Sequence, residues 1–445
     1  MDLHYPAGHV FYRNLHRSYP LITHGEGAYL YDSEGKRYLD ASGGAAVANI
    51  GHGVKEIAVA LSAQAEKVGY LNGMQFSHLP VESLAERISR FLPFPKGKVF
   101  FLTSGAEAVE ASIKLARQYW VEQGKTNKHH VISRKPSYHG STLASLALAA
   151  RESYKSIYKP MLRSSHLIPA PYCYRCFCNE TYPACGLKCA HALEKKIQEL
   201  GEENVSAFIT EIIGGASSGA AVPPQEYFTV IRKICDDYDV LLIADEIMTG
   251  IGRTGKWLAC DHFNLKPDVI LLGKGLAGGY VPLSALAVRG GIVGAIFDND
   301  RSFLHAQTFA HHPVGCAAGV ATLAFIEKKR LLNKCLDMGH LLKESLLPLG
   351  SNSHVGDIRG QGLLFGIEFV RDKNSKTPFP REFRYTEKFL GEALKKGLVL
   401  WSHVGHADGI NGDLVLLAPP FTIASREISA IKAILSDTLG EMKIM

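Results

Sequence analysis

The chain has 445 residues, and its 49 Lys and Arg against 43 Asp and Glu leave a formal net charge of +6. Because basic and acidic residues are interspersed, this small charge gives no basis for a nucleic-acid-binding surface. Hydrophobic residues make up 46% and charged residues 21%, a globular balance that excludes a disordered chain, and the length suits two or three domains.

The sequence gives no sign of membrane insertion or secretion. No apolar run reaches the ~18 residues that cross a bilayer, and Arg289 interrupts the nearest one, residues 283–297. The N-terminal stretch has no apolar core followed by a small-residue cleavage site. Nine cysteines, an odd number, include four that are widely scattered, which favours a reducing compartment. We therefore expect a cytoplasmic protein.

The first half of the chain predicts a hairpin, helices and buried strands. Turn residues 32–35 lie between two short apolar segments, which is typical of a hairpin. Helical periodicity begins near residue 54, and a short buried strand is expected at 99–102. In the next segment, 105–123, apolar residues recur at steps of four, three and four, which places them on one face of a helix.

The middle of the chain predicts a parallel sheet. Its apolar runs are continuous rather than alternating, which is typical of strands covered on both faces. Helical segments at 189–200 and 224–238 separate several of them. The expected strands are 130–133, 207–210, 240–244, 268–272 and 284–288. The alternation of strands and helices predicts one large α/β domain.

The last part of the chain mixes helices with short strands. Helices are expected at 330–346, 384–396 and 425–442, and strands at 363–369 and 414–417. This pattern indicates a smaller α+β unit. No internal repeat or low-complexity tract is present.

Residues 250–255 match the G-x-G-x-x-G pattern of dinucleotide sites, but the context is wrong. Those glycines must stand at a strand-to-helix turn, whereas five residues, 245–249, separate them from the preceding strand. The segment that follows opens no amphipathic helix, and no acidic residue ends a second strand at the required spacing. We therefore do not expect a dinucleotide site here.

Three other positions carry chemistry that suits a ligand. Ser104 and the small residues after it begin a helix, which suits either an anion site or a plain capping box with Glu107. Asp245 ends a buried strand, where α/β sheets place ligands, although it could also cap a loop. Lys274 lies between glycines after the next strand, where burial would free its amine for Schiff-base chemistry; the alternative is a surface lysine in a flexible loop.

Taken in order, these motifs resemble the class III aminotransferases, which are pyridoxal-phosphate (PLP) enzymes of fold type I. The resemblance covers nearly the whole chain. It rests on Ser104-Gly105-Ala106, Tyr138-His139-Gly140, Asp245-Glu246-Ile247, residues 250–255, Gly273-Lys274-Gly275, Thr308-Phe309, residues 359–368 and Ala418-Pro419-Pro420.

The resemblance implies the fold and the domains. It predicts an α/β protein whose large PLP-binding domain has a mixed, mostly parallel seven-stranded sheet, with a small α+β domain built from both chain ends. On this reading residues 1–64 belong to the small domain. Residues 65–329 form the large domain, with a Cys-rich insertion at 171–189, and residues 330–445 complete the small domain.

The resemblance also assigns roles. Ser104, Gly105 and Ala106 would hold the PLP phosphate. Tyr138, followed by His139, would stack on one face of the ring and Ile247 would pack on the other. Asp245 would pair with the pyridine nitrogen and keep it protonated. Lys274 would bind the cofactor covalently and then act as general base and acid. Thr308 would reach the phosphate of the neighbouring subunit, so the expected assembly is a homodimer with a shared active site.

Three departures from the family pattern bear on the substrate. Met248 stands where many members carry Gln, and Leu416 stands where members that handle an α-carboxylate carry Arg. Glu211 precedes Ile212 instead of the usual Pro, which puts its role near the substrate in doubt. These features resemble the ω-amine branch more than the ornithine type. They predict a donor whose acid group, if present, lies far from the amine. The candidates to hold the acceptor's carboxylate are Arg163, His403 and His406.

A cysteine cluster falls outside the family pattern. Its spacing, C-x2-C-x-C-x6-C-x3-C, could supply thiolates to a zinc ion, although it matches no zinc motif closely. An iron–sulfur cluster or inert buried thiols are the alternatives, and His191 could be a further ligand or a surface residue. The candidate metal ligands are Cys173, Cys176, Cys178, Cys185 and Cys189.

The predicted activity is amino transfer from an amine, an ω-amino acid or diamine, to a 2-oxo acid such as pyruvate or 2-oxoglutarate. The fold also hosts PLP-dependent mutases, epimerases and decarboxylases, which share the lysine and the aspartate, and these form the second hypothesis. A non-catalytic metal-binding regulator is a third hypothesis that depends on the cysteines alone.

Overall fold

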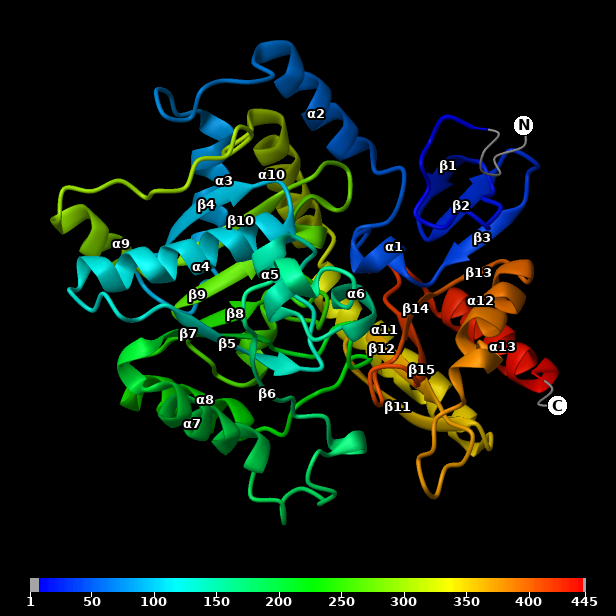
Figure 1. Cartoon of the computed structure of the whole chain (residues 1–445). Coiled ribbons are helices and arrows are strands. Elements are labelled where there is room, and N and C mark those ends of the chain that lie inside the picture. Colours follow the sequence, from blue (N-terminus) through cyan, green and yellow to red (C-terminus); the bar gives the residue numbers. More distant parts are fainter. Residues whose placement is uncertain (1–7, 443–445) are drawn as a thin grey trace.

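The computed structural model describes residues 8–442, and a seven-stranded sheet forms its centre (Figure 1). The order across the sheet is β4-β10-β9-β8-β7-β5-β6. The five strands from β9 to β6 run parallel to their neighbours, whereas β10 is antiparallel to both β4 and β9. The bounds are β4 (Lys98–Leu102), β5 (His130–Lys135), β6 (His166–Pro169), β7 (Val205–Glu211), β8 (Leu241–Asp245), β9 (Val269–Leu272) and β10 (Ser284–Val288).

Both faces of this sheet are covered, because successive strand residues point to opposite sides. In β8, Leu241 and Ile243 pack in a cluster with α4 (Gly105–Glu122), whereas Leu242 and Ala244 belong to the cluster on the other face. That second face is covered by α7 (Lys188–Leu200), α8 (Tyr227–Asp237) and α10 (Pro313–Lys328). In Figure 1 α4 lies on one side of the strands and α7 and α8 on the other. Because helices cover both faces, the strand sequences are continuous apolar runs rather than alternating patterns.

Shorter helices surround the main layers. Contacts join α2 (Lys55–Lys67) and α3 (Leu79–Ser89) to α10, and α9 (Gly290–Asp298) to α4. Two short helices, α5 (Leu143–Leu148) and α6 (Glu152–Lys155), follow β5.

Two four-stranded sheets lie beside the central one. The first has the order β1-β2-β3-β13, with β1 (Ile22–Glu26), β2 (Tyr29–Asp32), β3 (Arg37–Asp40) and β13 (Leu398–Val399). The second has the order β11-β12-β15-β14, with β11 (Val355–Gln361), β12 (Leu364–Phe369), β15 (Asp413–Leu417) and β14 (Trp401–Val404). Their helices are α11 (Leu331–Leu346), α12 (Tyr385–Lys395) and α13 (Ser425–Glu441). Because β13 pairs in parallel with β3, the N-terminal and C-terminal parts of the chain share one sheet.

The predicted hairpin is confirmed as β2 and β3, which pair antiparallel. The segment with the G-x-G-x-x-G pattern forms consecutive turns and opens no helix, as expected from its context. Its Arg253 is buried, and Nη1 donates to the carbonyl oxygens of Leu363 at 3.0 Å and Pro419 at 2.6 Å. That arginine therefore joins the central sheet to the C-terminal part. The domain boundaries drawn from the sequence stay a prediction.

Within residues 8–442, no helix is long and apolar enough to cross a membrane.

Candidate active site

A cavity of about 400 Å³ opens where the parallel strands end, and it gathers most of the predicted site residues. The residues shared by the prediction and the cavity wall are Ser104, Gly105, Ala106, Tyr138, His139, Glu211, Asp245, Ile247 and Lys274. Met248, which was singled out as a departure from the family pattern, also lines it. One cavity therefore joins motifs that lie far apart in the sequence.

The sheet itself brings the ionisable groups together. Glu211 ends β7 and Asp245 ends β8, and the two residues are paired partners across the parallel strands. Lys274 follows β9, the next strand over, and His139 follows β5. Since carboxyl ends of parallel strands lie at one edge of a sheet, these side chains converge there.

Asp245 is fixed by two hydrogen bonds. His139 donates its Nδ1–H to Oδ2 at 2.7 Å, and the backbone N–H of Ile247 donates to Oδ1 at 3.1 Å. Both side chains are buried, and Nε2 of His139 has no partner among the described residues. Because a carboxylate only accepts, the bond places the imidazole proton on Nδ1. These two hydrogen bonds fix the orientation of the carboxylate inside the protein.

Lys274 has the environment of a reactive amine. Its Nζ donates to the carbonyl oxygen of Ala45 at 2.9 Å and lies 5.0 Å from the centre of the Trp401 ring. Burial lowers the pKa of Lys274 to about 8, although the nearby charges of Asp245 and Glu211 act in the opposite direction. The backbone of Lys274 has φ +43°, a left-handed conformation that costs free energy in a residue with a side chain. A substantial fraction of the amine is neutral near physiological pH.

The start of α4 has both of the features that the sequence left as alternatives, a capping box and an anion site. Ser104 Oγ accepts from the N–H of Glu107 at 3.3 Å, and a Glu107 carboxylate oxygen accepts from the N–H of Ser104 at 3.0 Å, a capping box. The box still leaves the first helical N–H groups, those of Gly105 and Ala106, without partners inside the helix. A Cβ on Gly105 would lie 2.9 Å from Cδ1 of Ile247, so glycine keeps this end of the helix open. The arrangement can bind an anion.

Glu211 is a buried acid in the wall of the cavity. Its carboxylate accepts from the N–H of Gly215 at 2.9 Å and, through its other oxygen, from the N–H of Tyr138 at 3.4 Å. Burial raises the pKa of Glu211, and His139 and Arg134 oppose that rise.

Several lining residues escaped the sequence analysis. Val47 comes from the N-terminal part, Val281, Pro282 and Leu283 precede β10, and Trp401 comes from β14. Trp401 is the most informative, because its ring meets the lysine amine. Tryptophan is rare in this chain, with three in all, and that rarity is the one feature of the sequence that marks Trp401. No sequence motif connects it with Lys274.

Five predicted positions lie outside this cavity, and two of them, His403 and His406, line a separate one. Thr308 is exposed in a turn beside Phe309, whose ring is 6.0 Å from that of Tyr70. Arg163 lines a different cavity, beside His129 and His130. Leu416 is fully buried in β15, where it pairs with Trp401 of β14, so it lies next to the cavity wall rather than in it.

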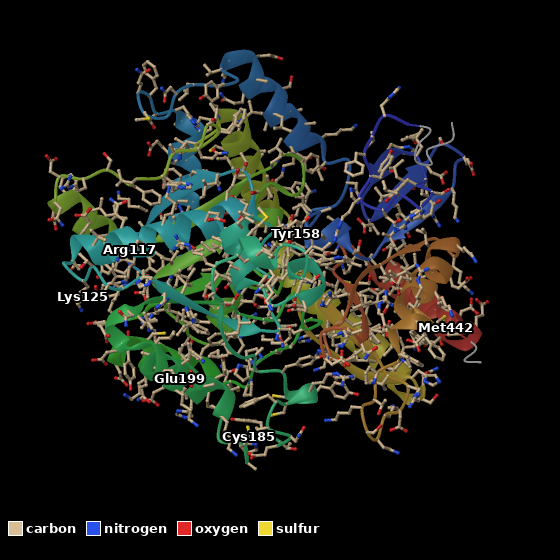
Figure 2. The ribbon with its side chains drawn as sticks, in the orientation of Figure 1. Arg117, Lys125, Tyr158, Cys185, Glu199 and Met442 are labelled. Atoms are coloured by element: carbon tan, nitrogen blue, oxygen red, sulfur yellow. The ribbon has the colours of Figure 1, made fainter. Side chains whose placement is uncertain are left out.

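The cysteine cluster lies apart from this cavity. It surrounds the short turn Cys173–Arg175 and ends in α7, and Figure 2 shows Cys185 at the edge of the molecule. The Sγ atoms of Cys176 and Cys178 are 3.4 Å apart. In the part of the chain that the structure describes, no group of three or more His, Cys, Asp or Glu side chains is arranged to hold a metal ion. The zinc hypothesis is therefore not confirmed.

Comparison with known proteins identifies the family. The sequence profile described as "Aminotransferase class-III" matches residues 11–439. The chain belongs to the class III aminotransferases. It is 37% identical over 430 residues to an uncharacterized aminotransferase, YodT, of Bacillus subtilis, covering 96% of this chain and 97% of that one. It is 33% identical over 418 residues to putrescine–pyruvate aminotransferase of Pseudomonas aeruginosa, covering 92% and 88%.

Solved structures confirm the predicted fold class. An (S)-enantioselective omega-transaminase from Thermomicrobium roseum aligns with a TM-score of 0.92 and 32% identity, over 98% of this chain and 96% of that one. A PLP-bound amine transaminase from an uncultivated Pseudomonas species aligns with a TM-score of 0.89 and 30% identity, over 98% of each chain. This class III aminotransferase therefore has the α/β fold of the PLP-dependent fold-type-I transaminases.

Proposed function

We propose that this aminotransferase binds PLP in the cavity at the strand ends and transfers an amino group to a 2-oxo acid such as pyruvate or 2-oxoglutarate. The donor we propose is an ω-amino acid or a diamine. The observation that carries the proposal is that Lys274, whose amine has a lowered pKa, and the buried carboxylate of Asp245 line one cavity of suitable volume. Class III aminotransferases depend on PLP, and the solved relatives include PLP-bound forms.

The residues present fit the cofactor's three chemical parts. The free N–H groups of Gly105 and Ala106, with Ser104, suit a phosphate at the start of α4. Tyr138 and Ile247 offer an aromatic and an aliphatic surface for the two faces of a planar ring. Asp245 supplies the buried carboxylate that a pyridinium nitrogen requires.

PLP, when bound, supplies an aldehyde that condenses with amines and a cationic ring that stabilises negative charge on the adjacent carbon. Lys274 contributes the amine that this aldehyde requires, and the lowered pKa of Lys274 keeps part of that amine neutral and nucleophilic. Once a substrate amine takes its place, the freed Nζ can accept a proton from the substrate carbon and return it one position away.

Asp245 and His139 act as one unit in this proposal. The carboxylate holds the proton on the ring nitrogen, and the imidazole fixes the direction of the carboxylate. Since both side chains are buried, water does not compete for the carboxylate. Replacing the carboxylate by a neutral group would remove the charge that makes the ring an electron acceptor.

The donor class follows from the residues beside the cavity. Leu416 provides no cation for an α-carboxylate, and Met248 provides only a weak thioether acceptor. A carboxylate attached to the reacting carbon would lose a charge-assisted interaction, which favours donors without one. The similarity to putrescine–pyruvate aminotransferase supports the same class.

We also propose a homodimer in which Thr308 of each chain reaches the other chain's cofactor. Support comes from the exposure of Thr308 and from the exposed apolar side chains of Met74, Phe76 and Phe309 in the same region.

The scattered cysteines, which form no disulfide among the described residues, support a cytoplasmic location.

The test is a half-reaction followed by a donor screen. Purified holoenzyme mixed with an amine alone should lose its visible absorption band as the pyridoxamine form accumulates, and a 2-oxo acid should restore it. A mutase, epimerase or decarboxylase would turn over without that stoichiometric change. Paired α-amino and ω-amino donors of equal length, each with pyruvate and with 2-oxoglutarate, then identify the substrate class. A clear preference for glutamate over every ω-amine would contradict the proposed donor.

A further inference from the structure

A second cavity, of about 460 Å³, lies between the carboxyl ends of β5 and β6 and the segment that follows β14. Basic and imidazole side chains dominate its polar wall: Lys135, Arg151, Lys155, Arg175, His403 and His406. Two acidic residues, Glu152 and Asp408, also line it. The cavity therefore has the charge of a site for an anion.

This cavity adjoins the cofactor cavity. The guanidinium of Arg151 lies 5.2 Å from the ring centre of Tyr138, which lines the cofactor cavity. Trp401 and His403 are two positions apart on β14, so their side chains share a face of that strand, and each lines one of the two cavities. The linings of the two cavities are therefore in contact with each other.

Arg151 is a buried cation without an anionic partner. It is 8% exposed, and within residues 8–442 no carboxylate lies within ion-pair distance of it. Its Nη2 donates to Nδ1 of His403, and its Nε has no hydrogen-bond partner. Burial and the Arg151 cation hold the pKa of His403 well below its ordinary value, so the imidazole is neutral and offers no counter-charge. Burying an unpaired cation is costly, and an anionic ligand would remove that cost.

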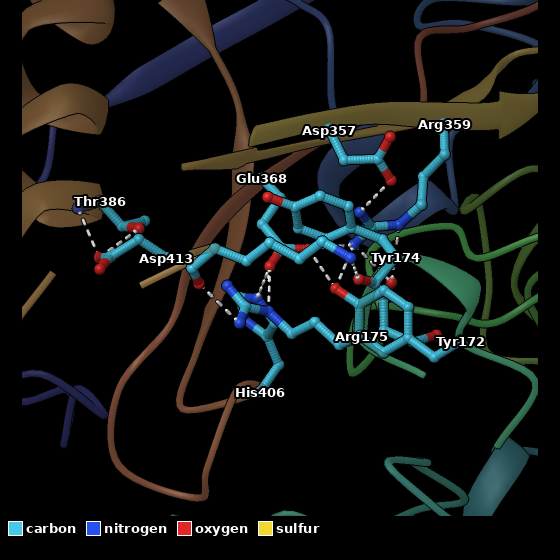
Figure 3. Close-up of polar contacts among 11 residues, drawn as sticks. Tyr172, Tyr174, Arg175, Asp357, Arg359, Glu368, Thr386, His406 and Asp413 are labelled. Carbon is cyan, nitrogen blue, oxygen red and sulfur yellow. Dashed lines mark hydrogen bonds and ion pairs between the residues drawn. The ribbon is translucent and has the colours of Figure 1, made fainter. Parts of the chain in front are cut away.

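A second guanidinium has a free edge in the same cavity. Figure 3 shows Arg175, Arg359 and His406 converging on the carboxylate of Glu368. Arg175 uses Nε for Glu368 and Nη1 for the carbonyl oxygen of Lys376 at 2.9 Å, and its Nη2 has no partner. Because the Tyr172 hydroxyl also donates to Glu368, four side chains already surround that carboxylate, and it is not available to pair with Arg151.

The remaining charged groups of the wall are largely engaged or exposed. Lys155 Nζ donates to two backbone carbonyl oxygens and to Ser165. Asp408 accepts from the N–H groups of Ile410 and Asn411 in a turn, and Glu152 is exposed. Among the described residues, Arg151 and Arg175 each keep one buried guanidinium nitrogen without a partner, and Lys135 is an exposed cation of the same wall.

We propose that this cavity is the subsite for the distal carboxylate of the substrate, with Arg151 as the main specificity-determining residue and Arg175 as its second donor. The inference rests on the proposed function and narrows it. The donor is an ω-amino acid whose chain passes Tyr138 and Trp401, rather than a diamine, because a second ammonium would meet the cations of this wall.

The kinetic test compares donors of equal chain length. The donors are β-alanine, 4-aminobutanoate and 6-aminohexanoate, each paired with the alkylamine and the diamine of the same length. The wild-type enzyme should prefer one of the ω-amino acids over both partners. The preference is measured as kcat/KM for the ω-amino acid divided by kcat/KM for the alkylamine of the same length. Arg151→Gln should lower this ratio roughly 10- to 100-fold, and Arg151→Lys should lower it less. The matched control is Arg371→Gln, an exposed arginine that lines neither cavity, which should keep the wild-type ratio.

A binding experiment separates this inference from the proposed function. Calorimetric titration of the holoenzyme with glutarate and with adipate, which carry no amine, should show binding to wild type and Arg371→Gln and none to Arg151→Gln. If no amine is transaminated yet this difference in binding appears, the function fails and the anion subsite stands. Equal binding by Arg151→Gln and wild type overturns the inference. So does a wild-type preference for diamines, a result that needs no variant to fold.

Discussion

The imidazole of His139 and the carboxylate of Asp245 form a buried pair joined by a 2.7 Å hydrogen bond, although 106 positions separate them in the sequence. The pair links the carboxyl ends of β5 and β8 across the intervening strand β7. An aspartate held this way cannot turn from the cavity without leaving the imidazole donor unpaired.

Asp245→Asn should lower the rate roughly 10²-fold or more, because the amide cannot hold a proton on the cofactor ring. Stopped-flow measurement of the half-reaction with a good donor would give the effect on the chemical step. His139→Ala should have a smaller effect in the same direction, since it frees the carboxylate without removing it. A near-normal rate in Asp245→Asn with bound PLP would reject the assignment.

Lys274→Ala should abolish both turnover and the visible band of bound cofactor, because Lys274 is the one lysine that residues 8–442 contribute to the cavity wall. Borohydride reduction followed by peptide mapping would locate any covalently attached PLP. Lys67→Ala is the control, since Lys67 is exposed at the end of α2 and lines neither cavity. A variant lacking Lys274 that still carried a reducible PLP linkage would show that another lysine does the chemistry.

The rate at which apo-enzyme takes up PLP should depend on pH through Lys274. The pKa of Lys274 is lowered to about 8, so the amine is protonated below that pH and neutral above it. The rate of appearance of the visible band should therefore rise with pH and level off above about 8. In Asp245→Asn the midpoint should move to lower pH, because the lost charge favoured the protonated amine. A profile still rising steadily at pH 10 would mean an ordinary lysine.

Thr308→Asp should weaken PLP binding by placing a negative charge near the neighbouring chain's phosphate. The measurement is the PLP concentration that half-saturates the visible band, with sedimentation velocity at the same protein concentration. Ser302→Asp, an exposed position in the same loop, serves as the control. A fully active monomer, or unchanged PLP affinity in a dimer, would contradict the shared site.

Ser104→Ala should cost about 1 kcal/mol of stability, because it removes the side-chain half of the capping box at α4. Urea denaturation of the apo-enzyme isolates this effect from any loss of phosphate contact. A loss much larger than that in apo-enzyme would mean that Ser104 has further structural roles.

The strands, and the site residues that directly follow a strand, could be predicted from the sequence. Residues that reach the site from other elements through tertiary packing could not. The buried runs of β7, β8 and β9 stand out because both faces are covered, and Asp245 and Lys274 follow directly from where those runs end. The short edge strand β6 and the polar strand β11 lack such a run.

Trp401 and Arg151 reach the two cavities through tertiary packing. Trp401 depends on the antiparallel pairing of β14 with β15, and Arg151 depends on its contacts with Tyr138 and His403. No spacing of residues in the sequence indicates the contacts of Trp401 or of Arg151. A pattern of residue types can therefore indicate the chemistry of the cofactor while leaving the substrate-facing wall undetermined.

The hydrogen bond from Lys274 Nζ to Ala45 O ties the amine to a part of the chain that supplies no ionisable group to the cavity. Ala45 lies just after β3, which pairs with β13, and the carbonyl oxygen of Ala41 accepts from the N–H of Ala418. The anchor of the amine is thus held by contacts between residues 39–45 and residues 398–418. A ribosome-bound chain that has not yet reached these later residues would lack that support, so the amine acquires its setting only after they have been made.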